Sequence, residues 1–359
     1  FRLWDMHIHN LNDSSTAAPW DFHAPDAADA DPREIYLPIY AAFGITGTRE
    51  MSGGLASIAL REQIEDGSLR GPHMVVGSPI LDGDPPLFPG GPNLPIDGPV
   101  RARAVVDSLH AAGFDFLKPY TLLGAEAYRA LVARADELGI PVAGEIPIAV
   151  SAWDVATLGQ RSIEHLTGVE FASSSREDEF RAEFLEGIEA RTALPEDSAA
   201  LHAQAIWNRS EWEPLATLDL DKQARLFAHL AANDTWVVPT LVVQRQISYA
   251  DDPAIAEDPD LRYADPWSQD VRSTADEFDP ERRLRPLYDH RAAVVSELHA
   301  AGVGILAGSD AVGGFTLHQE LEIFVEGGLS PLDALRTATS NAAVFLERES
   351  ELGSIAEGK

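Results

Sequence analysis

Short apolar runs alternate with longer helical patterns along most of the chain. Runs of this length, bounded by turn residues, predict buried strands. The predicted strands cover residues 3–9, 44–51, 74–81, 114–120, 140–146, 162–169, 236–243 and 304–310. Several of the helical patterns between them end in glycine, as at Gly113 and Gly139, which is typical of a left-handed helix cap. Eight strands separated by helices predict an α/β fold, specifically a parallel (β/α)8 or TIM barrel.

The chain is longer than such a barrel requires. A (β/α)8 barrel needs about 250 residues, and this chain has 359. The surplus lies near residues 10–33, 170–233 and 245–285, and each of these insertions follows a predicted strand. Because barrel enzymes build their sites at the carboxyl ends of strands, we expect the insertions to act as lids or specificity loops. Residues 1–350 are therefore predicted to form one domain.

Composition narrows the classes of partner. The chain has 58 acidic and 27 basic residues, a formal charge of -31, and no basic cluster, which argues against nucleic acid and anionic membranes. No apolar run approaches the roughly 20 residues needed to span a bilayer. The absence of cysteine excludes disulfides and thiolate metal sites. We expect a soluble protein. The start at Phe1 indicates a trimmed chain, so the compartment, cytoplasmic or exported, stays open. Whether the chain forms a homo-oligomer also stays open.

Two histidines end the first predicted strand. His7 and His9 are two residues apart, so strand geometry points both side chains to the same face, here the barrel interior. Imidazoles arranged in this way are candidate metal ligands. The alternative is a pair of polar residues at a strand end.

Lysine is scarce, and one lysine lies inside a strand. The chain has 24 arginines but only three lysines, and Lys118 falls within the apolar run of residues 114–120. A buried lysine is costly unless it is paired or modified. Because the chain otherwise uses arginine for positive charge, Lys118 indicates chemistry that requires loss of a proton. An ion-paired lysine is the alternative.

Two further polar residues end predicted strands. His165 lies at the end of the apolar part of the sixth strand, and Asp310 ends the eighth. Either residue alone is more often structural than a ligand. Together with His7, His9 and Lys118, however, they place three imidazoles, a carboxylate and a lysine at the ends of four strands of one barrel. Such convergence indicates a functional site.

This arrangement resembles the amidohydrolase superfamily, and within it the imidazolonepropionase-like and Xaa-Pro dipeptidase-like branch. The order His-x-His, Lys, His and Asp on strands one, four, six and eight carries the resemblance. Local motifs support it at residues 44–46, 162–166, 307–310, 318–321 and 334–343. The resemblance covers essentially the whole chain.

The resemblance implies a divalent metal centre, with two Zn2+ ions expected and a single ion as the alternative. His7, His9 and Asp310 would hold one metal. Lys118, as a carbamate, would bridge to a second metal held partly by His165. The family also carries a small β-sandwich built from both chain ends, so residues 351–359 are expected to begin a sandwich segment that is otherwise missing or trimmed.

Glu145 departs from the family pattern, which has a histidine at the end of strand five. Three interpretations remain open. Glu145 could replace the imidazole as an oxygen ligand, which zinc accepts at a similar distance. It could instead pair with an uncarbamylated Lys118 at a single-metal site, or it could impair the second metal site. As a ligand it would lower the charge of a two-metal cluster by one and weaken its Lewis acidity.

The implied reaction is the hydrolysis of an amide bond in a small molecule, such as a dipeptide, a prolidase substrate or a lactam. Metal-activated hydroxide would attack the carbonyl, with Asp310 as the proton shuttle and His165 as a second catalytic group. Tyr120 and His318 are candidate substrate-binding residues; each is otherwise a structural side chain. Arg49 could meet a substrate carboxylate or form an internal ion pair.

Two other classes of function compete with the enzyme. A catalytically impaired or non-catalytic barrel that binds a metal or ligand would fit the replacement at Glu145. A nucleotide-dependent enzyme would require a glycine-rich phosphate loop, and residues 83–91 lack the G-x-G-x-x-G spacing.

Overall fold

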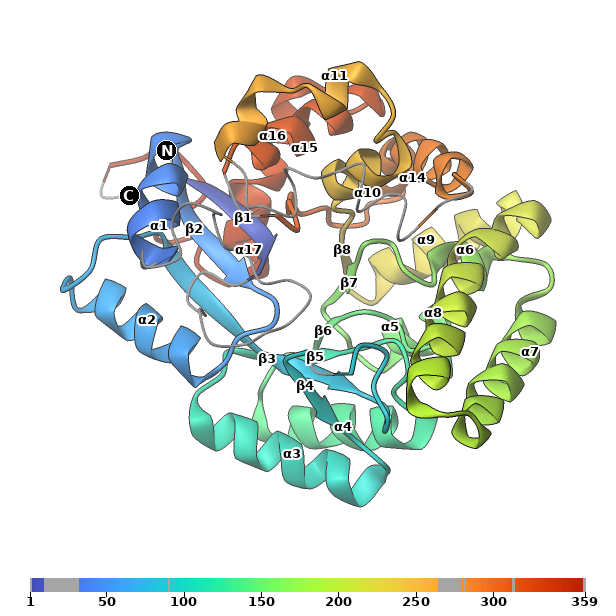
Figure 1. Ribbon diagram of the computed structural model, residues 1–359. Helices are drawn as coiled ribbons and strands as arrows, with labels where there is room; N and C mark the ends of the chain where they lie inside the picture. Colours follow the sequence, from blue (N-terminus) through green and yellow to red (C-terminus); the bar gives the residue numbers. More distant parts are fainter. Residues whose placement is uncertain are drawn as a thin grey trace. The chain divides into compact units, whose positions relative to one another are not determined.

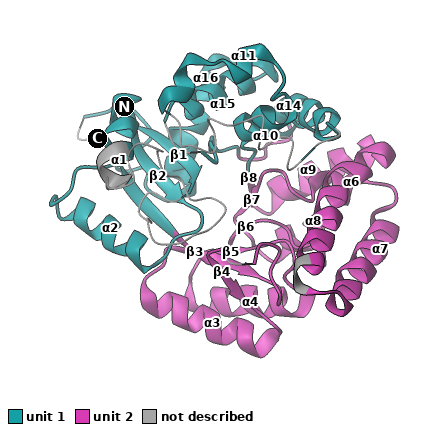
Figure 2. Cartoon of the chain, in the orientation of Figure 1, with its two compact units in different colours: residues 1–76, 238–300, 305–359 teal, residues 77–237, 301–304 magenta. Residues whose placement is uncertain are grey.

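The structure is a computed structural model that describes residues 2–9, 32–89, 91–263, 279, 282–311 and 314–357. Its contacts divide the chain into two compact units (Figure 2). Unit 1 comprises Phe1–Val76, Val238–Ala300 and Ile305–Lys359, and unit 2 comprises Gly77–Val237 and Ala301–Gly304. Both units are built from parallel strands and helices, so the chain has an α/β fold (Figure 1).

The strands of unit 1 pair in parallel. β1 (Leu3–Ile8) pairs with β2 (Ile45–Glu50), and β2 pairs with the first residues of β3 (His73–Asp82). The segment predicted as the eighth strand runs along β1, since Met6 N donates to Ala307 O and Asp310 N donates to His7 O. All six residues of β1 are buried. β1 therefore lies between two neighbours, which fixes the positions of the side chains at its end.

Helices make up most of the remainder of unit 1 (Figure 1). They have amphipathic sequences whose apolar faces supply buried residues such as Tyr40, Leu298 and Phe324. The helices are α1 (Pro32–Ala42), α2 (Leu55–Glu65), α10 (Leu241–Ser248), α11 (Pro253–Ala256), η3 (Pro259–Tyr263), α14 (Leu284–Ala300), α15 (Phe315–Glu326), α16 (Pro331–Thr337) and α17 (Ser340–Phe345).

Unit 2 continues the parallel pattern. The end of β3 pairs with β4 (Asn93–Pro95) and with β5 (Phe116–Pro119). β6 (Ala143–Gly144) pairs with β7 (Ser162–Glu164), and β8 (Trp236–Val238) follows β7 in the same sheet. Leu117 of β5 also bridges to Val142 in parallel. β5, which carries Lys118, and β6, which precedes Glu145, are therefore neighbours within this unit.

Two helices of unit 2 end at the glycines that the sequence indicates. Gly113 and Gly139 cap α3 and α4 with φ values of 87° and 70°, as predicted, because glycine adopts this conformation without strain. Asp219 accepts from Lys222 N and caps α9. The helices are α3 (Pro99–Ala112), α4 (Ala125–Leu138), α5 (Ala152–Thr157), α6 (Val169–Ser173), α7 (Glu177–Ala190), η1 (Arg191–Ala193), α8 (Glu196–Trp212), η2 (Glu213–Thr217) and α9 (Leu220–Ala232).

The predicted strand at 236–243 is too long. β8 ends at Val238, and Leu241 begins α10 instead. Thr240 adopts φ +48°, and the carboxylate of Glu320 accepts from Leu241 N at 2.9 Å and from Val242 N at 2.7 Å. A buried carboxylate at a helix N-terminus satisfies amides that a strand would have paired with a neighbour. Tertiary contact therefore converts an apolar run into a helix.

Other strand predictions also need correction. The predicted strand at 162–169 ends at Glu164, because His165 and Leu166 both have positive φ values and α6 begins at Val169. The short strand β4 was not predicted, because prolines and glycines surround it in the sequence. Residues 304–310, predicted as the eighth strand, form no regular strand, although their backbone bonds to β1. The other five predicted strands coincide in part with β1, β2, β3, β5 and β6.

The insertions differ in how far the structure describes them. Residues 170–233, predicted as a mostly helical insertion, form the helices α6 to α9. Most of the loop at 10–33 lies outside the described residues, as do 264–278 and 280–281 of the insertion at 245–285. At the carboxyl end of the chain, residues 351–357 form turns, and residues 358–359 of the expected sandwich segment are outside the described residues. No described helix is long and apolar enough to cross a membrane.

Candidate active site

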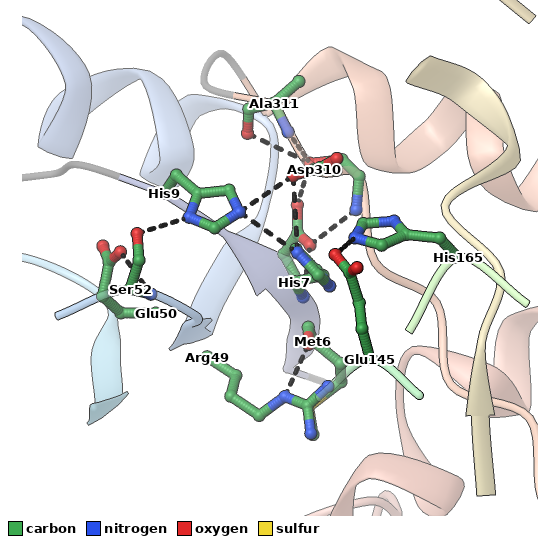
Figure 3. Close-up of polar contacts among 12 residues, drawn as sticks. Met6, His7, His9, Arg49, Glu50, Ser52, Glu145, His165, Asp310 and Ala311 are labelled. Carbon is green, nitrogen blue, oxygen red and sulfur yellow. Dashed lines mark hydrogen bonds and ion pairs between the residues drawn. The ribbon is translucent and has the colours of Figure 1, made fainter. Parts of the chain in front are cut away.

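Three of the predicted ligands converge in unit 1 (Figure 3). His7 Nε2 lies 3.2 Å from His9 Nε2 and 3.4 Å from Asp310 Oδ1, and His9 Nε2 lies 3.0 Å from the same carboxylate oxygen. His7 is fully buried, whereas His9 and Asp310 are each about one-fifth exposed at their side chains. One residue of β1, one residue just after it and one from a segment 300 residues later thus share one polar centre at the strand end.

The backbone explains why Asp310 reaches the histidines. Asp310 N donates to His7 O at 2.8 Å, and Asp310 itself adopts φ +53°. A side chain on Gly308 would place its Cβ 2.6 Å from His7 Cβ, so only glycine permits this close approach. Left-handed backbone at a residue other than glycine is uncommon and is concentrated at functional sites. This segment is therefore shaped to place the Asp310 carboxylate beside the imidazoles.

Ser52 orients His9. The Ser52 hydroxyl oxygen lies 2.7 Å from His9 Nδ1, on the side of the ring opposite the Asp310 contact. If Nδ1 carries the proton and donates to Ser52, Nε2 keeps its lone pair toward His7 and Asp310. Ser52 N in turn donates to Glu50 Oε1 at 3.4 Å. Sequence reasoning missed Ser52, although it is a polar residue just after a strand, like the candidate residues that were identified.

Asp5 holds the two strand ends together. Its carboxylate accepts from Ser309 N at 2.9 Å, from the Ser309 hydroxyl at 2.6 Å and from His7 N at 3.2 Å. Burial raises the pKa of Asp5 to about 7, while these hydrogen bonds lower it and the charge of Asp310 adds to the rise. Sequence reasoning also missed Asp5, which lies beneath the ligands rather than among them.

The donor set in unit 1 fits a divalent ion. Two ligand atoms about 2.1 Å from a zinc ion lie roughly 3.0–3.4 Å apart for angles between about 90° and 109°. The three distances among His7 Nε2, His9 Nε2 and Asp310 Oδ1 span 3.0–3.4 Å. Two imidazole nitrogens and a carboxylate oxygen also match the ligand types that zinc prefers. The residues therefore have both the chemistry and the spacing of a metal centre.

Unit 2 contains the other predicted ligands. Lys118 lies on β5 with 1% exposure, and its Nζ is 5.5 Å from the centre of the Tyr120 ring. Its backbone amide donates to the Ser78 hydroxyl at 3.0 Å, which anchors the strand. Lys118 is therefore a buried amine, as the sequence predicts. Tyr120 is also largely buried and packs in an apolar cluster with Phe171 and Phe184.

Glu145 follows β6 and is buried (Figure 3). Its Oε2 accepts from the Thr121 hydroxyl at 2.8 Å, and its Oε1 lies 3.7 Å from His165 Nε2. Burial raises the pKa of Glu145 to about 8, although the positive charge of Lys118 and the Thr121 hydrogen bond lower it. Glu145 thus meets an imidazole and a hydroxyl, and Lys118 acts on it as a nearby charge.

His165 occupies a strained turn directly after β7. His165 and Leu166 have φ values of 61° and 60°, a conformation that non-glycine residues rarely adopt. The preceding Glu164 is fully buried and accepts from the Ser162 hydroxyl at 2.5 Å. Strain of this kind persists only where the surroundings fix it, and it is concentrated at functional sites. The turn directs the imidazole toward Glu145 within unit 2.

Two residues that the sequence left undecided have structural contacts. His318 lies on α15, where its Nε2 is 2.9 Å from Phe43 O and its ring packs against the Phe43 ring. Arg49 is buried, donates from Nε to Met6 O at 2.6 Å and lies over the Phe345 ring. His318 therefore supports the connection between α1 and β2, and Arg49 supports the strand that carries His7.

Comparison with protein families identifies one match. A model of the Amidohydrolase family matches residues 39–359, nearly the whole chain. None of the curated proteins matches the chain in sequence.

Solved structures of similar fold include several hydrolases. Bottromycin amidohydrolase matches with a TM-score of 0.68 and 22% identity, over 97% of this chain and 67% of that one. An Xaa-Pro dipeptidase matches with a TM-score of 0.63 and 21% identity, over 100% of this chain and 78% of that one. Ochratoxinase from A. niger matches with a TM-score of 0.63 and 16% identity, over 99% of this chain and 74% of that one. At these identities the likeness concerns the fold.

Proposed function

The chain belongs to the amidohydrolase family, and from this premise we propose that it is a metal-dependent hydrolase that cleaves the carbon–nitrogen bond of a small-molecule amide. The observation that carries the proposal is the spacing of His7 Nε2, His9 Nε2 and Asp310 Oδ1, which are 3.0–3.4 Å from one another. Structural neighbours that include an Xaa-Pro dipeptidase support dipeptides and related amides as the substrate class.

The proposal includes a closed (β/α)8 barrel with all the site residues at the carboxyl ends of its strands. The pairs β1–β2, β2–β3, β3–β5 and β6–β7 are parallel, which supports this architecture. Within unit 1, His7 and His9 lie at the end of β1, and Asp310 ends the segment beside it. Within unit 2, Lys118, Glu145 and His165 lie at or just beyond the ends of β5, β6 and β7.

His7, His9 and Asp310 would hold one divalent ion, with zinc the best fit to two imidazoles and a carboxylate. Lys118 as a carbamate, Glu145 and His165 would hold a second. When bound, the metal supplies Lewis-acid activation of water and of the substrate carbonyl. Glu145 would contribute Oε1, since its Oε2 accepts from Thr121.

In this proposal Asp310 transfers the proton and His165 stabilises the developing charge. Asp310 accepts a proton at its carboxylate from the attacking water and returns it to the departing amine nitrogen. The hydrogen bond from Asp310 N to His7 O holds this segment beside the imidazoles during the transfer. His165 Nε2 supports the developing negative charge on the carbonyl oxygen if only one ion is bound. Tyr120 is the favoured substrate contact in this proposal because it lies beside Lys118. His318 is the weaker candidate because its Nε2 contacts Phe43 O.

The test combines metal analysis with a screen of amides. The purified chain, loaded with Zn2+ and freed of excess metal, should retain one to two ions per chain by elemental analysis and should hydrolyse members of a panel of dipeptides, lactams and aryl amides. Chelation should abolish turnover, and Asp310→Asn should lower kcat by at least roughly 100-fold. Incubation with 13C-labelled bicarbonate should give a carbamate signal that Lys118→Arg lacks.

A non-catalytic metal- or ligand-binding role is the second candidate, because Glu145 stands where the family resemblance expects histidine. The same experiment separates the two functions. A chain that retains metal but hydrolyses no amide in the panel would support the binding role and contradict the hydrolase.

A further inference from the structure

A small cavity in unit 2 adjoins the proposed reaction residues. Its walls come from the turn after β5, the loop after β6, and helices α6, α7 and α8 (Figure 1). Thr121 is one lining residue, and its hydroxyl donates to Glu145 at 2.8 Å. Ile146, which directly follows Glu145 in the chain, is another. The cavity therefore lies beside a proposed metal-site carboxylate.

Trp207 of α8 lines this cavity and has an unused hydrogen-bond donor. Its indole nitrogen Nε1 is buried and has no acceptor among the described residues. Buried donors are nearly always hydrogen-bonded, because leaving one unpaired is costly. The ring is held in place, since it packs against an apolar cluster that includes Ile148 and Phe171, and its centre lies 5.9 Å from that of the Phe88 ring. A ligand oxygen in the cavity would supply the acceptor that the indole N–H lacks.

Ser210 supplies an acceptor oxygen to the same cavity. It is buried, and its hydroxyl gives its proton to Trp207 O at 2.7 Å. The oxygen keeps lone pairs with which it can accept a hydrogen bond. Ser210 lies three residues after Trp207 on α8, so the two side chains are neighbours on the helix surface. Helix α8 thus provides a donor and an acceptor side by side.

The charged residues of the lining have partners within the protein. Arg181 Nη1 donates to Ile148 O at 2.5 Å and to Val150 O at 2.9 Å. Its Nη2 donates to Glu177 Oε1 at 2.6 Å. Glu211 also has an interaction of its own. An uncharged ligand leaves these interactions intact.

The size of the cavity limits the ligand. It has room for a group of about the size of one water molecule. A hydroxyl group has this size, is uncharged, and can accept one hydrogen bond while it donates another. It therefore matches both the indole N–H of Trp207 and the oxygen of Ser210. A methyl group has a similar bulk but leaves the indole N–H unpaired.

We propose that this cavity binds a hydroxyl group of the substrate, with Trp207 Nε1 as the donor to its oxygen and Ser210 Oγ as the acceptor of its proton. The proposal deepens the amide hydrolase function and rests on it. It narrows the substrate class to amides that carry a hydroxyl group close to the scissile bond, and it makes Trp207 a specificity-determining residue.

The first experiment compares matched substrates. For an amide that the enzyme hydrolyses, kcat/KM is measured for a form with a hydroxymethyl group beside the scissile bond, as in serine, and for the form with a methyl group, as in alanine. The wild type should favour the hydroxymethyl form by at least about tenfold, because a site built to bind a hydroxyl rejects the analogue that lacks it. Trp207→Phe keeps an aromatic ring but removes the N–H. It should lower kcat/KM for the hydroxymethyl form by roughly tenfold and change that for the methyl form by less than about twofold. Trp212→Phe, the same change on α8 at a residue that does not line the cavity, should match the wild type.

The second experiment needs no turnover. The indole nitrogens of the tryptophans are labelled with 15N, and the Trp207 signal is identified in NMR spectra by its loss in Trp207→Phe. L-Serine is titrated into the labelled chain, with L-alanine as the reference. Serine should shift the Trp207 signal until the site is saturated, because its hydroxyl accepts from the indole N–H, and alanine should not. The Trp212 signal, identified in the same way from Trp212→Phe, should respond to neither.

Thermal unfolding of each variant confirms that it is folded. If Trp207→Phe does not fold, Ser210→Ala replaces it in the kinetic comparison. This variant removes the proposed acceptor and should lower the preference for the hydroxymethyl form by roughly 3- to 10-fold. The serine titration of the wild type then relies on an indole signal that serine shifts and alanine does not.

The outcomes separate this inference from the function beneath it. Equal hydrolysis of both substrate forms, with no shift of the Trp207 signal by serine, would mean that the cavity holds water only; it would overturn the hydroxyl site and leave the hydrolase standing. A preference for the hydroxymethyl form that is unchanged in Trp207→Phe would also contradict the site. A saturable shift of the Trp207 signal by serine alone, in a chain that hydrolyses no amide, would support the cavity as a hydroxyl site and refute the hydrolase.

Discussion

His9 Nδ1 lies 2.7 Å from the hydroxyl oxygen of Ser52. In the tautomer in which Nδ1 donates to Ser52, Nε2 keeps its lone pair toward His7 and Asp310, and partners of this kind typically contribute 10- to 100-fold to metal affinity. Ser52→Ala should therefore weaken zinc binding by roughly that factor, measured on the metal-free chain by competition with a chelator. Ser68→Ala, at an exposed turn in the same unit, should bind zinc like the wild type. Equal affinities in all three proteins would show that Ser52 does not orient the ligand.

The residue at position 145 should control how many ions the chain retains. Glu145→His restores the neutral ligand that the family resemblance expects and removes one buried acid. We expect it to raise occupancy of the second metal, measured as zinc per chain after dialysis. Glu145→Gln, which removes the charge without supplying an imidazole, is the control. Unchanged metal content in Glu145→His would count against a ligand role for this position.

Asp82 organises the strand ends of unit 2 by hydrogen bonds. Its buried carboxylate accepts from Leu87 N at 2.7 Å and from Leu122 N at 2.6 Å. Asp82→Ala leaves both amides without this acceptor and should lower the free energy of unfolding by roughly 2–5 kcal/mol, measured by urea denaturation. Asp97→Ala, at an exposed position, should change stability by less than about 0.5 kcal/mol. A small effect of Asp82→Ala would mean that water replaces the lost acceptor.

Glu320 should make stability depend on pH. Burial raises the pKa of this carboxyl to about 8 from a usual value of 4.5, although the amides of Leu241 and Val242 lower it. Between these pH values the folded chain holds a proton that the unfolded chain has lost, so stability falls as pH rises. In metal-free protein, Glu320→Gln should gain stability relative to wild type by up to about 1.4 kcal/mol per pH unit across this range.

Urea denaturation at several pH values between about 5 and 8 measures this slope. Glu322→Gln removes an exposed acid from the same helix and should keep the wild-type slope. Parallel slopes for wild type and Glu320→Gln would indicate that Glu320 is ionised throughout the range.

The net charge should make stability depend on salt. A formal charge of -31 imposes repulsion on the folded chain, and salt screens such repulsion. The melting temperature should rise by several degrees between about 0.05 M and 1 M sodium chloride, where the screening length falls to about 3 Å. The measurement is repeated at a pH close to the sequence pI of 4.5, where the salt effect should shrink. A melting temperature that falls with salt at neutral pH would show that ion pairs dominate the surface electrostatics.

The sequence by itself determined the chemical types of the site residues and much of the strand order. Period-two spacing placed His7 and His9 on one face, and the scarcity of lysine singled out Lys118, which the structure buries in β5. These inferences succeed because strand geometry and the cost of burying charge act locally. Both can therefore be inferred from the residues of a single segment.

The tertiary structure decided which residues meet. Ser52 and Asp5 contact their partners only because parallel strands distant in sequence end together, and no local pattern encodes that contact. In the same way, residues 241–243 begin a helix because Glu320, far along the chain, accepts the amides of Leu241 and Val242. Side-chain partners across long sequence separations depend on packing, so the sequence indicated the proposed ligands and the fold supplied the groups that contact them.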